Sequence, residues 1–213
     1  MDLARLGQIG NKIRADFDAK DAAREKALAL SREVIRNSAN AIRAVHRGEF
    51  DDARKLLVVT GEMVAQARKL LRGHPEIYSA GFAQDAQKEY AEARLTLALI
   101  HREPVPDPDE LKVDYAAYLN GLAEAVGELR RHVLDEMRQA EPTWGEELLT
   151  AMDDIYYLLV SFDYPSAITN NLKRTTDVTR SIIERTRGDM TSAQRQERLE
   201  QAMRRLEKHI EEE

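Results

Sequence analysis

Two glutamates stand one helical turn apart in the segment QKEYAEARL, residues 87–95. Glu89 and Glu92 are three positions apart, so on a helix both carboxylates leave from the same flank. Like charges at about this spacing repel by roughly 0.2–0.5 kcal/mol on an isolated helix. A nearby cation would offset that repulsion.

A second acidic pair follows in GLAEAVGELRRH, residues 121–132. Glu124 and Glu128 are four positions apart and therefore share one face of a helix. At about 100° per residue, this face lies nearly opposite the apolar positions and in line with Ala117 and Gly121. Small residues there let another backbone, a metal or a ligand come close. The alternative is that the face is only solvated.

Acidic pairs on successive helices can converge on one or two hard divalent cations, because Mg²⁺ and Mn²⁺ prefer oxygen ligands. A cation there would polarise a phosphoryl oxygen and lower the pKa of a bound water. The competing interpretation is a set of surface carboxylates, which are common in a chain that is 33% charged. Spacing alone leaves both interpretations open.

The sequence gives less support to other kinds of catalytic or metal site. A ferritin-like di-iron bundle requires Glu-x-x-His on two helices, whereas Glu128 and His132 are four apart and have no matching second motif. The absence of cysteine excludes thiolate metal sites and cysteine nucleophiles. No glycine-rich phosphate loop or Ser-His-Asp arrangement is indicated. The remaining histidines fall near predicted helix ends or in the tail and are expected to be caps or surface residues: His46, His74, His101 and His209.

Composition describes a helical protein with a heavily charged surface. Of 213 residues, 43% are hydrophobic and 6% aromatic, with few glycines or prolines and no shift that would mark a boundary. We expect one domain spanning residues 1–213. No apolar run is long enough to cross a membrane, no secretory signal is visible, and cysteine is absent, so we expect a cytoplasmic protein without a membrane partner. A net charge of −6 argues against a general basic surface but leaves room for local ones.

Helical spacing of apolar residues predicts the elements that position these acids. One long helix covers residues 2–47 and ends at Gly48. A second runs from Asp51 or Asp52 to Arg72, and a third from Pro75 to about His101. Pro104, Pro106 and Pro108 predict an exposed connection. Later helices are expected over 113–138, from Pro142 to Phe162, from Pro165 to a stop at Gly188, and from a capping box at Thr191 and Gln194.

The acidic pairs fall on the third and fourth of these helices, each of which has an apolar seam that is expected to be buried. The seam of the third helix consists of Phe82, Ala86, Tyr90, Ala93, Leu97 and Ile100. That of the fourth consists of Tyr115, Leu119, Leu122, Val126, Leu129 and Val133. Seven helices with short links predict an all-α antiparallel bundle. Apolar surface on more than one side of the long helices predicts an oligomer.

Several segments together resemble the translin family, which comprises translin and its catalytic partner, translin-associated factor X. The resemblance covers nearly the whole chain and is that of an archaeal-type single-chain member. It is carried by the long first helix, the GHP break, QKEYAEA, DYAAYLNGLAEAVGELRRHV and the late block YPSAITNNLKRTTDVTRSIIERTRGDMT. QKEYAEA resembles the acidic Glu-x-x-Glu element of the catalytic branch, which the non-catalytic branch lacks.

The resemblance assigns roles to the acids. Glu89 and Glu92 match the first two acidic residues of the catalytic branch. The family pattern Gly-x-x-Asp-x-x-Gly-Glu-Leu reads here Gly121, Glu124, Gly127, Glu128 and Leu129. Glu128 therefore matches, whereas Glu124 replaces an aspartate and extends the carboxylate by one methylene. The resemblance implies that the four glutamates are catalytic ligands of Mg²⁺ or Mn²⁺.

The family resemblance also implies a seven-helix protomer that assembles into a closed homo-octameric barrel and takes single-stranded RNA, or single-stranded DNA, into its interior. Members of the catalytic branch are metal-dependent endoribonucleases, whereas a non-catalytic member would be an RNA- or DNA-binding scaffold. A structural oligomer with merely solvated acidic faces is a third alternative. Basic residues beside the acids are candidate phosphate contacts in this picture: Lys88, Arg94, Arg130 and Arg131. Tyr90, Tyr115 and Tyr118 are candidates for base stacking, although Tyr90 and Tyr115 are expected to belong to the core first.

Overall fold

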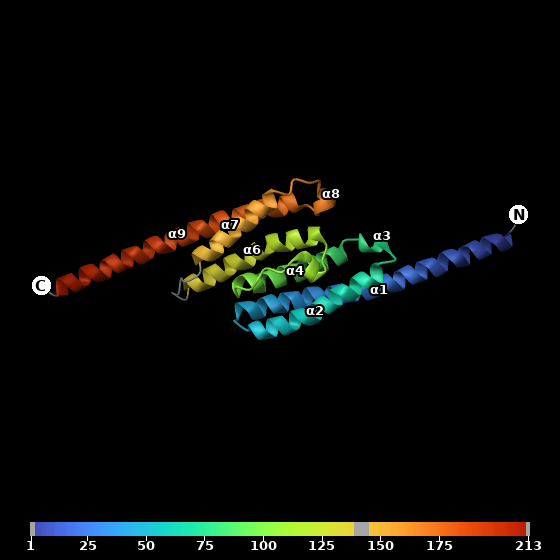
Figure 1. Cartoon of the computed structure of the whole chain (residues 1–213), viewed down its shortest axis with the longest axis horizontal. Coiled ribbons are helices and arrows are strands. Elements are labelled where there is room, and N and C mark those ends of the chain that lie inside the picture. Colours follow the sequence, from blue (N-terminus) through green and yellow to red (C-terminus); the bar gives the residue numbers. More distant parts are fainter. Residues whose placement is uncertain (1–2, 139–144, 212–213) are drawn as a thin grey trace. The chain divides into compact units, whose positions relative to one another are not determined.

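The computed structural model describes residues 3–138 and 145–211, and over these ranges every regular element is a helix (Figure 1). Six helices have 16 residues or more, and three are single turns of four residues. The elements are α1 (Leu3–His46), α2 (Phe50–Leu71), α3 (Pro75–Tyr78), α4 (Phe82–Ile100), α5 (Pro108–Leu111), α6 (Tyr115–Arg138), α7 (Gly145–Val160), α8 (Ser166–Thr169) and α9 (Leu172–Glu211). The predicted all-α fold is confirmed.

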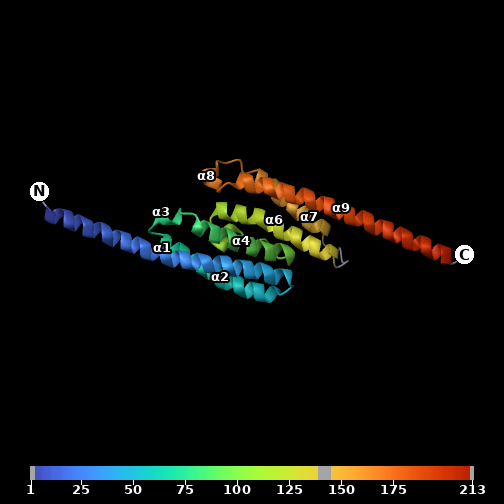
Figure 2. The ribbon, with the colours of Figure 1, turned by 180° about the vertical axis from the view of Figure 1, so that it is seen from behind.

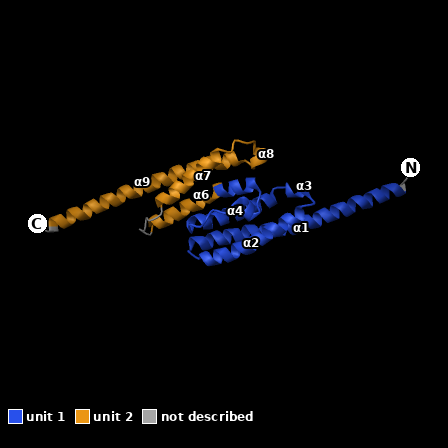
Figure 3. Cartoon of the chain, viewed as in Figure 1, with its two compact units in different colours: residues 1–122 blue, residues 123–213 orange. Residues whose placement is uncertain are grey.

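The chain forms two compact units, residues 1–122 and 123–213, whose boundary lies inside α6 (Figure 3). Unit 1 therefore contains α1 to α5 and the first two turns of α6. Unit 2 contains the remainder of α6 and α7 to α9. The two units are described separately.

Unit 1 is built around α1, α2 and α4, which pack on one another in all three pairings. α1 and α2 form an antiparallel hairpin that lies side by side in both views (Figures 1 and 2). Gly48, with φ +75°, makes the turn between them, a left-handed conformation that glycine adopts without steric cost. Ala27, Val34, Leu57 and Leu95 are among the fully buried side chains that result.

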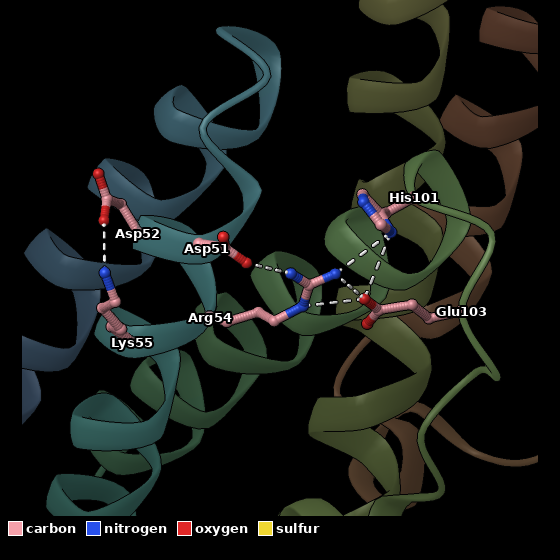
Figure 4. Close-up of polar contacts among 6 residues, drawn as sticks. All are labelled: Asp51, Asp52, Arg54, Lys55, His101 and Glu103. Atoms are coloured by element: carbon pink, nitrogen blue, oxygen red, sulfur yellow. Dashed lines mark hydrogen bonds and ion pairs between the residues drawn. The ribbon is translucent and has the colours of Figure 1, made fainter.

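An ionic network ties the start of α2 to the end of α4 (Figure 4). The Arg54 guanidinium donates to the carboxylates of Asp51, 2.7 Å away, and Glu103. The His101 ring lies 4.2 Å from the Phe50 ring, edge to face, with its Nδ1 3.3 Å from Arg54. His101 is the C-cap residue of α4, as expected for a histidine at a helix end.

The predicted third helix is interrupted, and this is a correction to the sequence reading. Residues 75–101 contain a single turn, α3, and then α4 from Phe82. Gly81 separates them with φ +96°, outside the right-handed helical region. The proline-rich connection after α4 also contains a helical turn, α5, whose N-cap Asp107 forms a capping box with Glu110.

Unit 2 corrects the predicted end of the sixth helix. α9 runs for 40 residues without a break, so Gly188 does not stop it and residues 191–194 do not begin a new helix. Thr191 instead donates its hydroxyl to the Arg187 carbonyl one turn earlier, which is the bond of an interior helical threonine. α7 packs on α9, where Arg187 pairs with Asp153 at 2.6 Å. The predicted helix start at Pro142 lies outside the described residues.

Two helix segments carry exposed apolar residues at helical spacing. In the first half of α1, Leu6, Ile9, Ile13 and Phe17 are 46–63% exposed. In the last third of α9, Leu199, Met203, Leu206 and Ile210 are 55–65% exposed. Both segments fit the expectation that long helices keep apolar surface for a partner. None of the described helices is long and apolar enough to cross a membrane.

Candidate metal centre

The first acidic pair lies on α4, which is buried around most of its circumference. Glu92 is only 9% exposed to solvent, and the Glu89 side chain is 28% exposed. Buried carboxylates are uncommon unless a cation or hydrogen-bond donors compensate them. Their position at the edge of the α4 seam, as the spacing predicted, removes much of their water.

The start of α6 lies against α4 because Gly121 has no side chain. A Cβ atom on Gly121 would stand 2.7 Å from the Lys88 carbonyl oxygen and 2.9 Å from the Glu92 amide nitrogen. Both separations are shorter than a carbon atom tolerates. Gly121 and the buried Ala117 therefore form a contact surface between two helix backbones, and this face of α6 is not simply solvated.

This contact brings acids from both helices together. Glu124 lies three residues beyond Gly121 on the same unbroken helix, so it projects near the same side of α6 one turn later. One carboxylate oxygen from each of Glu89, Glu92 and Glu124 lies within 4.8 Å of the other two. Three of the four predicted acids thus converge, and their oxygens are the atoms that would hold a cation.

The cluster brings negative charge together, and an ion pair with Lys88 offsets part of it. The ammonium of Lys88 lies 3.2 Å from the Glu89 carboxylate, and its side chain is 23% exposed. Carboxylates gathered in a partly buried place favour binding of a cation.

Glu128, the fourth predicted acid, does not belong to the group of three. It lies one turn further along α6, and its Oε2 is 3.9 Å from the Arg131 guanidinium. Glu128 and Glu124 are four residues apart on α6 and share a helix face, as predicted, but only Glu124 is among the carboxylates that meet within 4.8 Å.

A hydrogen-bonded clamp that the sequence reading missed fixes the start of α6 on α4. Gln87 is 2% exposed; its amide oxygen accepts from the Asp114 backbone N–H at 2.7 Å, and its amide nitrogen donates to the Tyr78 hydroxyl at 2.9 Å. Tyr78 in turn donates to the Asp114 carboxylate. Burial, followed by this hydrogen bond, raises the pKa of Tyr78. The sequence did contain a signal for this clamp: Gln87 is a polar residue four positions after Ala83 and three before Tyr90, which places it on the buried face of the helix.

Tyr90 belongs to the core, as predicted, at 4% exposure. Its hydroxyl reaches α2 at Gly61, where a Cβ atom would come within 2.6 Å of the hydroxyl oxygen. Burial raises the pKa of Tyr90, and the neighbouring Arg94 opposes that rise. Arg94, a predicted phosphate contact, is therefore a partner of Tyr90.

The other predicted aromatic positions differ. Tyr115 was expected on the buried seam of α6 but is 63% exposed, which corrects that prediction. It is the first residue of α6, and its hydroxyl lies 3.3 Å from both Asp109 carboxylate oxygens. Tyr118 is half-buried and donates to the Pro106 carbonyl at 2.9 Å.

The two predicted basic residues on the second half of α6 have different surroundings. Arg130 donates to the Thr186 hydroxyl at 3.1 Å and to Asp189 at 2.8 Å, which fastens α6 to α9 within unit 2. Arg131 keeps 54% of its side chain exposed. Of this pair, Arg131 has the guanidinium that an external phosphate can reach without breaking the link to α9.

Comparisons with known proteins found similar sequences and similar folds. No family profile matches the sequence. The chain is 32% identical over 191 residues to the uncharacterized protein MJ0175 of Methanocaldococcus jannaschii, covering 88% of this chain and 84% of that protein. AfC3PO, solved in complex with duplex RNA, matches 86% of this chain and 95% of its own at 32% identity and a TM-score of 0.79.

A second solved protein shares the fold at greater distance. Apo-NeC3PO matches 86% of this chain and 96% of its own, with a TM-score of 0.78 at 18% identity. This likeness shows the fold alone. With relatives at 32% identity covered over more than four-fifths of their length and C3PO proteins as structural neighbours, the chain belongs to the translin family.

Proposed function

We propose that the protein is a metal-dependent endoribonuclease that cleaves single-stranded or short structured RNA inside a homo-oligomeric barrel. The observation that carries the proposal is the convergence of Glu89, Glu92 and Glu124 within 4.8 Å. This convergence joins the two acidic segments that the resemblance to the catalytic branch singled out.

The donor set fits a hard divalent cation. Mg²⁺ binds oxygen ligands at about 2.0–2.1 Å, commonly takes one or two carboxylates and keeps several waters. Three carboxylate oxygens within 4.8 Å of one another can meet around such an ion after small side-chain rotations. Glu89, Glu92 and Glu124 would hold Mg²⁺ or Mn²⁺, with Glu128 as the fourth acid, one turn further along α6. The ion, when bound, would polarise a phosphoryl oxygen and lower the pKa of a coordinated water.

The chain's own residues orient these groups. Gly121 sets the separation of α4 and α6, and Gln87 fixes the start of α6 against α4. Lys88 beside Glu89 supplies a positive charge next to the acids, where it would neutralise an RNA phosphate. A preorganised set of charges is what electrostatic stabilisation of phosphodiester cleavage requires.

RNA as the substrate is supported by the AfC3PO complex with duplex RNA, since that protein is 32% identical to this chain over most of its length. A homo-octamer is supported by the family and by the exposed apolar residues of α1 and α9. Together these support an enclosed assembly in which RNA reaches the acids from the interior.

A second candidate is a non-catalytic scaffold that binds RNA or DNA. One observation favours it: Glu124 stands where the family pattern has aspartate, so one ligand is a methylene longer. A Mg²⁺ site is strict about distance, and a longer side chain can displace the ion. In that case the oligomer would retain nucleic acid without cutting it.

Cleavage of labelled single-stranded RNA, measured with Mn²⁺ and with chelator, tests the proposal. We expect Glu89→Gln with Glu92→Gln to lower the cleavage rate by at least about a hundredfold, because two charged ligands are lost. Binding of Mn²⁺, followed by calorimetry, should weaken in parallel. Glu197→Gln with Glu200→Gln is the matched control, since these exposed glutamates of α9 have the same spacing.

Three outcomes separate the candidates. Cleavage that survives chelator or the α4 double substitution removes these glutamates as metal ligands. RNA retention without cleavage by the wild-type protein establishes the scaffold. An equal loss of activity in the α9 control would show that the effect comes from charge in general.

A further inference from the structure

A groove of about 600 Å³ opens in unit 1 at the C-terminal end of α2, away from the acidic cluster in sequence. Its lining comes from α2, from the start and end of α3, and from the segment that joins α5 to α6. Neither the proposed metal centre nor the predicted phosphate contacts use any of these residues. The volume falls in the range of about 300–1,000 Å³ that is typical of ligand sites.

The groove is strongly basic. Four cationic side chains line it, together with one carboxylate. Arg68 offsets that carboxylate, since its guanidinium lies 3.5 Å from Asp114. Within residues 3–138 and 145–211, the side chains of Lys69, Arg72 and Lys112 make no hydrogen bond or ion pair, and all three residues are exposed. The groove therefore presents a surplus of three unpaired positive charges in a protein whose net charge is −6.

The backbone of Lys112 has an unfavourable conformation. Its φ is +56°, a left-handed conformation that lysine seldom adopts and that glycine or asparagine would satisfy better. The conformation is held by Arg68, which donates to the Lys112 carbonyl, and by the Val113 amide, which bonds to Pro108 at 3.1 Å. Lys69 lies in the last turn of α2, where a cation also complements the helix dipole, but Lys112 follows a single-turn helix and has no such role.

The rest of the groove is apolar and aromatic. Pro75 and the half-buried ring of Tyr78 line it beside Leu71. The Tyr78 hydroxyl is occupied by Gln87 and Asp114, which fixes the ring in position. Cations that follow a strand's phosphates, combined with an aromatic surface for a base or sugar, are the features of a single-stranded nucleic-acid groove.

We propose that this groove is a second RNA-contact site, in which Lys69, Arg72 and Lys112 bind consecutive backbone phosphates and Tyr78 contacts the adjoining base or ribose. An inorganic phosphate would fill only a small part of the space and leave the apolar lining unused. The inference rests on the proposed function in that it takes the same ligand, RNA. It assigns that ligand a contact separate from the carboxylates, so a strand bound here is held without being cut.

Gln87 forms a hydrogen-bonded link between the groove and the acidic helix α4. Tyr78 and Asp114, which line the groove, are the two partners of Gln87 on α4, two positions before Glu89. The same clamp that fixes the start of α6 thus also fixes one wall of the groove. RNA held there sits on a surface that is rigidly connected to α4.

The test is fluorescence anisotropy of a labelled single-stranded RNA with the full chain in excess chelator, so that binding is measured without cleavage. The test variant combines Lys69→Gln, Arg72→Gln and Lys112→Asn; asparagine removes the charge and tolerates the left-handed backbone. We expect the affinity to fall by at least about tenfold at moderate salt. The slope of log K against log salt should decrease in magnitude by about 2, because each contact to a single strand contributes about 0.7.

The matched control removes three unpaired, exposed cations from α1 in the same unit: Lys12→Gln, Lys26→Gln and Arg32→Gln. It carries the same net charge as the test variant, so it should bind within about twofold of the wild-type protein if the groove is specific. Circular dichroism and gel filtration on both variants establish that helix content and assembly are unchanged. A variant that loses either is replaced by the single substitution Lys112→Asn, for which a smaller loss and a slope change near 0.7 are expected.

Each result has a definite meaning. Wild-type affinity and slope in the test variant overturn the groove while leaving the proposed nuclease intact, because the wild-type protein still binds and cuts RNA. An equal loss in the control overturns the groove in favour of general charge. Binding of free uridine monophosphate that the test variant loses, with no change in RNA affinity, would show that the groove takes a nucleotide and not a strand. Absence of RNA binding by the wild-type protein would remove both proposals together.

Discussion

α4 buries polar side chains, whereas the last third of α9 exposes apolar ones. α4 has 19 residues, most of its side chains are buried, and among them are the carboxylate of Glu92 and the amide of Gln87. The last third of α9 is exposed throughout, yet Leu199, Met203, Leu206 and Ile210 lie on it at spacings of four, three and four. One segment buries polar groups and the other exposes apolar ones.

The difference shows where each helix obtains its stability. α4 is held by neighbours within unit 1, and its buried Gln87 is hydrogen-bonded to Tyr78 and to the Asp114 backbone. The side chains of α9 from residue 195 to residue 210 are exposed. Its apolar stripe is what a second copy of the chain would cover, in agreement with the expected oligomer. The buried polar side chains of α4 therefore mark the candidate site, and the exposed apolar side chains of α9 mark a surface for assembly.

The largest effect is expected from filling the contact between α4 and α6. Gly121→Val places branched carbon atoms against the Lys88 carbonyl and the Glu92 amide, so the helices must separate. We expect a loss of about 3 kcal/mol or more in the free energy of unfolding. Urea denaturation measures it. Gly127→Ala on the same helix is the control: its Cβ meets nothing within 4 Å, so stability should stay level or rise by about 0.5–1 kcal/mol.

The clamp should give an intermediate effect. Gln87→Leu keeps the volume but leaves the Asp114 amide and the Tyr78 hydroxyl without Gln87, at a cost of about 1–3 kcal/mol. If α6 then shifts on α4, affinity for Mn²⁺ should fall as well, measured by calorimetry. Gln66→Leu, at an exposed position of α2, serves as the reference. Unchanged stability and metal affinity in Gln87→Leu would mean that the clamp does not position the acids.

A smaller effect should appear at alkaline pH. Burial raises the pKa of Tyr90, so its folded-state pKa exceeds the unfolded value of about 10. The neutral hydroxyl is favoured in the folded chain, and its contribution is complete below about pH 10 and is lost as the pH rises through the folded-state pKa. Tyr90→Phe should therefore flatten the decrease in unfolding free energy above about pH 10. Tyr157→Phe, at a residue that is 70% exposed, should not alter that slope.

The smallest effect on protomer stability is expected in the exposed last third of α9. Leu199→Gln with Met203→Gln and Leu206→Gln should change unfolding free energy by less than about 0.5 kcal/mol, because these side chains are already in water within the chain. The mass of the assembly, measured by light scattering, should decrease. Arg195→Gln with Arg198→Gln on the same segment is the control. An unaltered mass would show that this stripe lies outside the subunit contacts.

Much of the helical framework could be predicted from the spacing of apolar residues and from the positions of glycine and proline. Gly48 and the break before Pro75 delimit α1 and α2 within one or two residues. Gly81 was missed because the residues around it continue a helical pattern and only its positive φ interrupts the chain. Gly188 was over-interpreted: glycine inside a helix costs about 1 kcal/mol, which a long helix packed on α7 tolerates.

The candidate site was predictable in composition but not in geometry. Spacing placed Glu89 with Glu92 and Glu124 with Glu128, each on one face, and the acids do lie on successive long helices. Which of them meet depends on where the two helices touch, and one sequence's periodicity contains no information on that point. Tyr115 shows the same limit, since it has seam spacing but is the first residue of α6 and is 63% exposed.

In the proposed metal centre, residue 121 also acts as a spacer between the helices that carry the acids. Since only a hydrogen atom separates α6 from the main chain of α4 there, the gap across which the carboxylates face each other is set by the size of a group that is not itself acidic. Replacing that hydrogen by successively larger groups would widen the gap in steps while every ligand stays chemically the same. The preferred ionic radius of the centre could thus be tuned from a position that never touches the ion.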